Sequence, residues 1–212
     1  MLKSYGVDME SVEHKFESLK HSVKLVFFTH ESHCAHCGEA RKLFSQIASV
    51  TRKIEFEAYN FAIDVDKDRE YGISAVPSVA IIGEKDFGIR YYGCPRGIEL
   101  NNFLDDIVYI SRGENTLPLR AAELLRALNR KTQLKIFISP TCPYSLPLVK
   151  TAIKLAIASE RINVDIIDAG DFLETGEKYN VRGVPMTVVN EQKSFYGALD
   201  EEEYIKRVLT MT

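Results

Sequence analysis

The stretch KLVFFTHESHCAHCGE, residues 24–39, decides the fold of this chain. Apolar residues suited to a β-strand occupy 25–28, polar residues follow, and helix-forming sequence begins near Glu39. The two cysteines of the stretch therefore lie at a junction between a strand and a helix. If the helix begins at Cys34, the sulfur of this residue lies where backbone N–H groups are unpaired and the helix dipole is positive. Such a position favours a thiolate.

A thiolate is the form of cysteine that attacks disulfides, so this junction predicts thiol–disulfide exchange. We expect Cys34 to be the nucleophile and Cys37 the resolving thiol, and the two to form a redox-active disulfide. The dipole alone contributes only about 0.3–1 kcal/mol, so further positive charge is needed. The first-turn amides and the Cys37 thiol are candidate donors, and His36 as an imidazolium would add a nearby positive charge. Together they would move the redox potential by about 20 mV in the oxidising direction. His36 is therefore a third candidate catalytic residue.

The composition is that of an ordinary globular protein. The 212 residues fit two domains of about 100 residues each. A net charge of −3 gives no reason to expect nucleic acid or an anionic membrane as a partner. No apolar run approaches the roughly 18 residues that span a bilayer, and the first twenty residues lack the apolar core of a secretory signal. We therefore expect a cytoplasmic protein, in which a CxxC pair is catalytic or metal-binding rather than a structural crosslink.

Hydropathy periodicity predicts alternating helices and strands in the first half of the chain. The expected helices are 8–20, 39–53, 66–71 and 97–111, and the expected strands are 24–30, 56–65, 78–82 and 89–92. Gly, Asn and Pro then cluster in 112–118, which marks a boundary between domains. We therefore predict one domain over 1–115 and a second over 116–212.

The second half repeats the plan of the first. The expected helices are 119–129, 142–160, 172–179 and 201–209, and the expected strands are 134–138, 162–167, 186–189 and 194–196. Cys34 precedes Pro77 by 43 residues, and Cys142 precedes Pro185 by the same interval. Chance is a poor explanation for this agreement. The sequence therefore indicates two tandem copies of one α/β unit.

A Val-Pro pair precedes a strand in each copy, as Val76-Pro77 and as Val184-Pro185. Proline at such a place can simply open a strand. Beside an attacking thiol, however, a loop with free backbone groups can pair with an extended substrate. These four residues are therefore candidates for substrate binding.

Together these motifs resemble those of a known family. A CxxC at a strand–helix junction, with Val-Pro about forty residues later, resembles the thioredoxin fold. Two such units, with TCPY in the second and YGISAVPS, YYG and DDIVYISRG in the first, resemble the protein disulfide oxidoreductases (glutaredoxin-like proteins) of archaea and thermophilic bacteria. The resemblance covers nearly the whole chain. It implies the α/β class with two tandem thioredoxin-like folds, each a central mixed β-sheet flanked by helices, and cis bonds at both Val-Pro pairs.

The resemblance also implies an activity and partners. Its members are enzymes that reduce, form or isomerise protein disulfides, so it implies these reactions for the Cys34/Cys37 dithiol, with protein disulfides and dithiols as substrates. A thioredoxin-reductase-type flavoenzyme and peroxiredoxins are further implied partners, in electron transport and cell redox homeostasis. We expect no cofactor and no metal.

The second unit matches the family at Cys142, Tyr144 and Pro185 but departs from it at Ser145, where a second cysteine is usual. Cys142 is therefore a candidate catalytic residue, and Tyr144 a candidate for substrate binding. A mixed disulfide at Cys142 has no neighbouring thiol to resolve it. Three interpretations stay open: a natural single-thiol or docking unit, a relay that needs Cys37 or an external thiol, and an engineered Cys-to-Ser change that traps intermediates.

Two other functions compete with catalysis. His30, His33 and His36 crowd the CxxC, so zinc is chemically feasible, but the second separated ligand pair of a structural zinc site is absent from the sequence. The chain could instead be a binding or scaffold protein that uses its second unit to hold peptides or partners. We expect Cys94, which has no thiol near it in sequence, to be a small core or surface residue.

Overall fold

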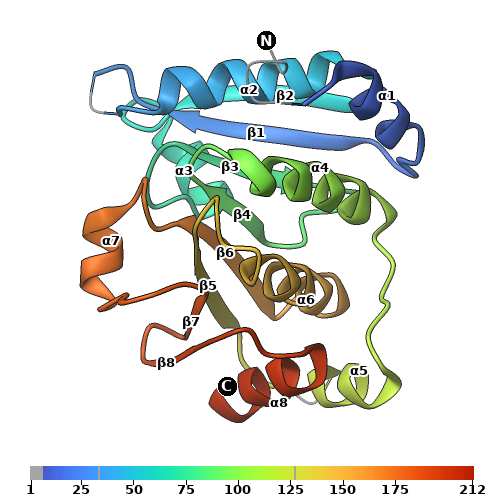
Figure 1. Cartoon of the computed structure of the whole chain (residues 1–212), viewed down its shortest axis with the longest axis vertical. Helices are drawn as coiled ribbons and strands as arrows, with labels where there is room; N and C mark the ends of the chain where they lie inside the picture. Colours follow the sequence, from blue (N-terminus) through green and yellow to red (C-terminus); the bar gives the residue numbers. More distant parts are fainter. Residues whose placement is uncertain (1–6, 33, 127) are drawn as a thin grey trace. The chain divides into compact units, whose positions relative to one another are not determined.

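The computed structural model describes residues 7–32, 34–126 and 128–212, which form two compact α/β units. The first unit comprises the described residues up to Asp86 together with Arg90–Gly113, and the second comprises Phe87–Ile89 together with 114–212. Figure 1 shows helices and strands alternating along each.

The first unit has the expected order of elements. These are α1 (Met9–Glu17), β1 (Val23–Thr29), α2 (Cys37–Ser49), β2 (Ile54–Asn60), α3 (Val65–Tyr71), β3 (Ser78–Ile82), β4 (Ile89–Tyr92) and α4 (Gly97–Arg112). Its strands lie in the order β2-β1-β3-β4. Strand β1 is parallel to β2 and antiparallel to β3, and β4 is antiparallel to β3, so the sheet is mixed.

Strand β1 is buried on both faces. On one face the ring of Phe27 lies 5.5 Å from that of Phe44 in α2, and Phe44 lies 5.5 Å from Phe103 in α4. On the other face the ring of Phe28 lies 5.9 Å from that of Tyr71 in α3. Successive side chains of a strand point to opposite faces, so burial of both faces explains the unbroken apolar run of β1. This packing holds α2 against β1.

Strand β2 ends at Asn60. The hydropathy pattern predicted a strand that continues to residue 65, and this prediction is wrong. The Asn60 side chain accepts a hydrogen bond from the Ala62 N–H (3.0 Å), and the Asp64 carboxylate accepts one from the Asn60 N–H (2.7 Å). Polar side chains that bond to nearby backbone in this way favour turns over strands. Helix α3 therefore begins at Val65.

The second unit repeats the layout. Its elements are α5 (Leu119–Arg126), β5 (Thr132–Ile138), α6 (Ser145–Ala158), β6 (Ile162–Asp168), α7 (Leu173–Lys178), β7 (Met186–Val189), β8 (Lys193–Tyr196) and α8 (Glu201–Met211). Its strands lie in the order β6-β5-β7-β8, with the same directions as their counterparts. Phe137 contacts Tyr179 as Phe28 contacts Tyr71, at 5.5 Å. The predicted α/β class, with a mixed sheet and flanking helices in each unit, is confirmed.

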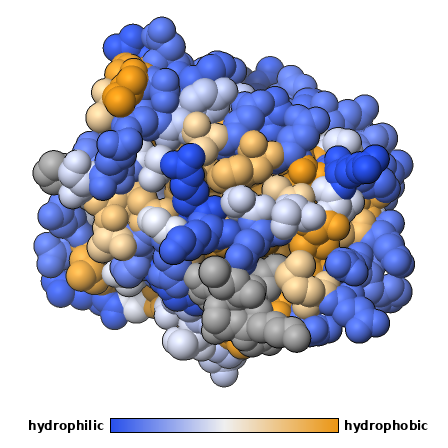
Figure 2. Space-filling model, turned by 90° about the horizontal axis from the view of Figure 1, so that it is seen from above, coloured by the Kyte–Doolittle hydropathy of each residue, from blue (hydrophilic) through white to orange (hydrophobic). Residues whose placement is uncertain are grey.

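The face of the molecule seen from above Figure 1 is mostly polar. Figure 2 shows that hydrophilic residues dominate the face seen from above Figure 1, with hydrophobic residues in smaller groups between them. No helix within the described residues is both long and apolar enough to cross a bilayer.

Candidate active site

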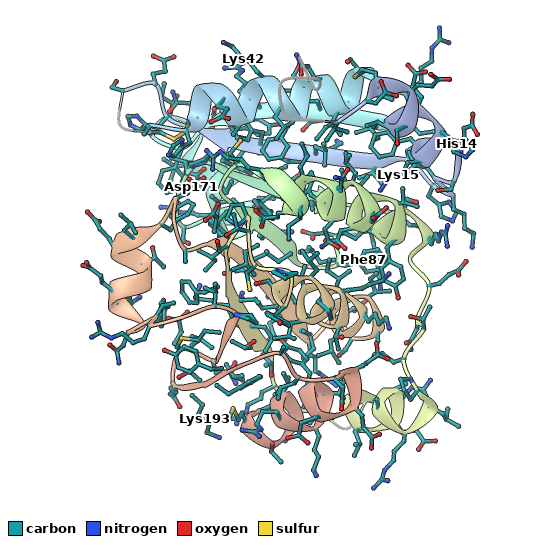
Figure 3. All side chains as sticks on the ribbon, in the orientation of Figure 1. His14, Lys15, Lys42, Phe87, Asp171 and Lys193 are labelled. Carbon is teal, nitrogen blue, oxygen red and sulfur yellow. A yellow bond between two sulfur atoms is a disulfide. The ribbon has the colours of Figure 1, made fainter. Side chains whose placement is uncertain are left out.

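Cys34 and Cys37 form a disulfide where the chain enters α2, and their Cα atoms are 5.4 Å apart. Figure 3 shows the side chains on the ribbon, with sulfur atoms in yellow. Helix α2 begins at Cys37, three residues later than a start at Cys34, so Cys34 precedes the helix. The His36 carbonyl accepts the first helical hydrogen bond, from the Ala40 N–H at 2.9 Å. Because the Cys34 sulfur is bonded to the first residue of the helix, it still lies within reach of the positive end of the dipole.

The two cysteines differ in accessibility. Cys37 is only 3% exposed, whereas Cys34 is partly exposed. A hollow of about 340 Å³ adjoins both, and it is lined by the ends of β1 and β2 and by the start of α2. His30 lies in its wall, where Nδ1 accepts a hydrogen bond from the Ser32 N–H at 3.1 Å. An incoming sulfur can therefore reach Cys34 more readily than Cys37.

Both Val-Pro bonds are cis, as expected. The Pro77 carbonyl, just before β3, accepts a hydrogen bond from the Gly93 N–H at 2.9 Å. The Pro185 carbonyl, just before β7, accepts one from the Gly197 N–H at 3.1 Å. The first bond fixes the Val76-Pro77 loop against the segment after β4, and the second fixes the Val184-Pro185 loop against the segment after β8.

In the second unit the structure brings Cys142 to the cis-proline loop. Its Sγ donates to the Val184 carbonyl at 3.7 Å. Ser145 occupies the first position of α6, as Cys37 does in α2, and it is fully buried. Within the described part of the chain, Ser145 Oγ has no hydrogen-bond partner. Tyr144 is 64% exposed beside it.

Sequence reasoning missed Arg96, which precedes α4. Its Nη2 lies 3.0 Å from His36 Nδ1 and 3.1 Å from Glu39 Oε2. His36 Nδ1 is also 3.8 Å from Glu39 Oε2. Arg96 lies between β4 and α4, about sixty positions after the CxxC. No motif in the sequence pointed to it. The structure thus places a permanent positive charge beside the dipeptide between the two cysteines.

The described histidines near the CxxC, His30 and His36, are not part of a metal-binding cluster. Over residues 7–32, 34–126 and 128–212 the structure contains no cluster of three or more His, Cys, Asp or Glu side chains suited to a metal ion. His33 lies outside the described residues. Cys94 is fully buried, which agrees with a small core residue.

Comparison with known proteins points to one family. A model of the thioredoxin domain matches residues 132–210. A probable thioredoxin of Archaeoglobus fulgidus is 32% identical over 71 residues, which are 33% of this chain and 78% of that protein.

Two solved structures share the fold over nearly the whole chain. A protein disulfide oxidoreductase from Aeropyrum pernix is 22% identical with a TM-score of 0.87, over 98% of this chain and 95% of that one. The NTD_N/C domain of alkylhydroperoxide reductase AhpF from Enterococcus faecalis is 22% identical with a TM-score of 0.84. The match covers 94% of this chain and 97% of that one. Both likenesses show that two tandem thioredoxin-like units make up this fold.

Proposed function

Because this chain belongs to the thioredoxin family, we propose that Cys34 and Cys37 are the reacting pair of a protein disulfide oxidoreductase. The chain is a thiol–disulfide oxidoreductase of the thioredoxin type, with protein thiols as substrates. A fold alone does not assign a reaction. The observation that carries the proposal is the disulfide between partly exposed Cys34 and buried Cys37 at the start of α2.

In the reducing direction, the Cys34 thiolate attacks one sulfur of a substrate disulfide. A bond forms between Cys34 and that sulfur, and the other substrate sulfur leaves as a thiolate and takes up a proton. The Cys37 thiolate then attacks Cys34 in this mixed disulfide and releases the second substrate thiol. Two electrons have passed to the substrate, and the enzyme ends with the Cys34–Cys37 disulfide seen here. Run in reverse, the same steps form a substrate disulfide.

Accessibility supports this division of roles. The first attack needs a sulfur that a bulky protein substrate can reach, and Cys34 is the more exposed of the two. The second attack is intramolecular, so burial of Cys37 does not hinder it.

Substrate binding is proposed for the residues around each cysteine. Val76 and Pro77 in the first unit, and Val184 and Pro185 in the second, would offer backbone groups to an extended segment of the substrate. The contact between Cys142 and the Val184 carbonyl supports this arrangement in the second unit. Exposed Tyr144 would add an apolar face.

The second unit is proposed to dock a substrate or to pass electrons to the first, because Cys142 has Ser145 in place of a resolving cysteine. We further propose two domains over 1–115 and 116–212, a cytoplasmic setting, and a thioredoxin-reductase-type flavoenzyme and peroxiredoxins as partners. The likeness to a domain of an alkylhydroperoxide reductase supports the wider association with reductase systems.

Insulin reduction by dithiothreitol tests the reacting pair. Cys34→Ser should abolish the acceleration seen with the wild type, whereas Cys142→Ser should retain it. Cys94→Ala is the matched control, since it removes one buried thiol outside both motifs. If activity is lost with Cys142→Ser instead, the roles of the two units are reversed. If the wild type does not exceed buffer, a binding or scaffold function is favoured.

Elemental analysis tests the zinc alternative. We expect less than a tenth of a zinc ion per chain after purification under reducing conditions. Stoichiometric zinc that is lost in Cys37→Ser would overturn the redox assignment of the pair.

A further inference from the structure

Arg96 reaches the dipeptide between the two cysteines from the start of α4. It contacts His36 Nδ1 at 3.0 Å and Glu39 Oε2 at 3.1 Å, and its side chain is only 27% exposed. We propose that Arg96 is a positioning residue that orients His36 and sets the charge beside the Cys34–Cys37 pair, and thereby sets the redox potential of this couple. The proposal rests on the proposed function and adds a residue to it.

The contact with His36 fixes which nitrogen carries the proton. A guanidinium group has only N–H donors and remains protonated in proteins. Nδ1 of His36 must therefore accept the hydrogen bond, because a proton on Nδ1 would face a cation at 3.0 Å. This contact selects the ring tautomer that carries its proton on Nε2. Arg96, rather than an imidazolium at His36, supplies the positive charge at this place.

Helix capping does not explain an arginine at this position. Arg96 is the N-cap residue of α4 but makes no capping hydrogen bond with its side chain. In the second unit, Asp200 is the N-cap of α8, and its carboxylate accepts from the Glu203 N–H at 2.9 Å. Asp is a favoured N-cap residue, and Arg is not. The first unit thus has a poor cap where the second has a good one, and its side chain extends to the CxxC segment instead.

The charges of Arg96 and Glu39 act on the couple with opposite signs. A positive charge near Cys34 favours its thiolate, which stabilises the reduced pair and makes the couple more oxidising. The Glu39 carboxylate, in the first turn of α2, disfavours the thiolate. Arg96 binds Glu39 and offsets it. Removal of Arg96 therefore takes away a positive charge and also the offset that it provides to the negative charge of Glu39.

Equilibration with glutathione buffers measures the effect. In Arg96→Gln the equilibrium constant for forming the Cys34–Cys37 disulfide should rise about fivefold, which is about 20 mV toward a more reducing potential. Glu39→Gln should shift the constant in the opposite direction. Arg52→Gln is the matched control, because Arg52 is exposed beyond the far end of α2. A helix of this length spans about 20 Å, which exceeds the Debye length, so we expect no change.

Nitrogen-15 NMR of the histidine rings supplies a second measurement. Wild-type His36 should show the Nε2–H tautomer, and Arg96→Gln should lose this preference. Arg96→Lys keeps the charge without the forked geometry, so its equilibrium constant should stay within about twofold of wild type while the tautomer preference weakens. If Arg96→Gln does not fold, the shift in Glu39→Gln and the tautomer of His36 in Arg96→Lys still test the proposal.

The proposal would be overturned if the equilibrium constant is unchanged in both Arg96→Gln and Glu39→Gln, or if it shifts in the same direction in both. A purely structural role of Arg96 does not predict shifts in opposite directions. In that case wild-type Cys34 and Cys37 would still equilibrate with glutathione, and the proposed function would stand. Failure of the wild-type pair to equilibrate at all would instead overturn both.

Discussion

Ser145→Cys should convert the single-thiol site of the second unit into a dithiol. Ser145 begins α6 three residues after Cys142, as Cys37 begins α2 three residues after Cys34. In the first unit this placement holds the two Cα atoms 5.4 Å apart, within the range that a disulfide spans. The equivalent position in the second unit should therefore allow a Cys142 disulfide to form.

The effect on stability has two parts. The buried Ser145 hydroxyl lacks a partner, which costs about 1–3 kcal/mol, and a thiol in its place relieves most of this cost but needs slightly more room. We expect the reduced variant to gain about 1 kcal/mol. Closing a loop of this size adds about 2 kcal/mol from chain entropy in the oxidised variant.

Urea unfolding with and without dithiothreitol measures both parts, and mass spectrometry after alkylation counts the free thiols. The oxidised variant should unfold about 1 M higher in urea than wild type. Ser111→Cys is the matched control, because this buried hydroxyl does donate a hydrogen bond, to the Val108 carbonyl at 2.6 Å, and its loss should destabilise. Oxidised Ser145→Cys should keep one free thiol, that of Cys94, beside its two disulfides. Three free thiols, or a lower urea midpoint, would refute the structural equivalence of the two units.

Three further predictions follow from other parts of the structure. Cys37→Ser should accumulate a mixed disulfide between Cys34 and a protein substrate, visible on a non-reducing gel and lost when Cys34 is also replaced. Phe44→Ala should lower the free energy of unfolding by about 3–5 kcal/mol, and Phe44→Leu by clearly less, because the ring joins α2 to the sheet. Burial, with a smaller effect of nearby Asp64, raises the pKa of Asp68, so the folded state binds this proton more tightly than the unfolded state and the stability from this group falls as pH rises above about 4. Asp68→Asn should therefore gain stability relative to wild type between pH 4 and pH 7 in urea titrations, and an equal difference at both values would contradict this assignment.

The sequence predicted most of the fold because the pattern of apolar residues and the repeat are both strong signals. The equal intervals from Cys34 to Pro77 and from Cys142 to Pro185 identified two copies of one unit, and the structure has the same strand order in both. The end of β2 was placed wrongly, because apolar residues continue past Asn60. The side-chain bonds that end this strand depend on which polar groups lie close in space, and hydropathy does not report that.

The candidate site was predictable only where its residues lie in motifs. The CxxC and Val-Pro pairs were found because their spacing is regular, and both prolines are cis as expected. Helix α2 begins at Cys37, between the predicted start at Glu39 and the start at Cys34 that the thiolate argument assumed, because helix-start signals do not fix a boundary to within two or three residues. Arg96 was missed because only tertiary packing brings the start of α4 to His36.

A single-turnover reaction tests the central claim most directly. Reduced wild-type protein is mixed with an equal amount of insulin, quenched with an alkylating agent and mapped by peptide mass spectrometry. The account predicts one Cys34–Cys37 disulfide for each insulin disulfide that opens into two thiols. The claim would be contradicted if insulin keeps its disulfides and both Cys34 and Cys37 are found alkylated.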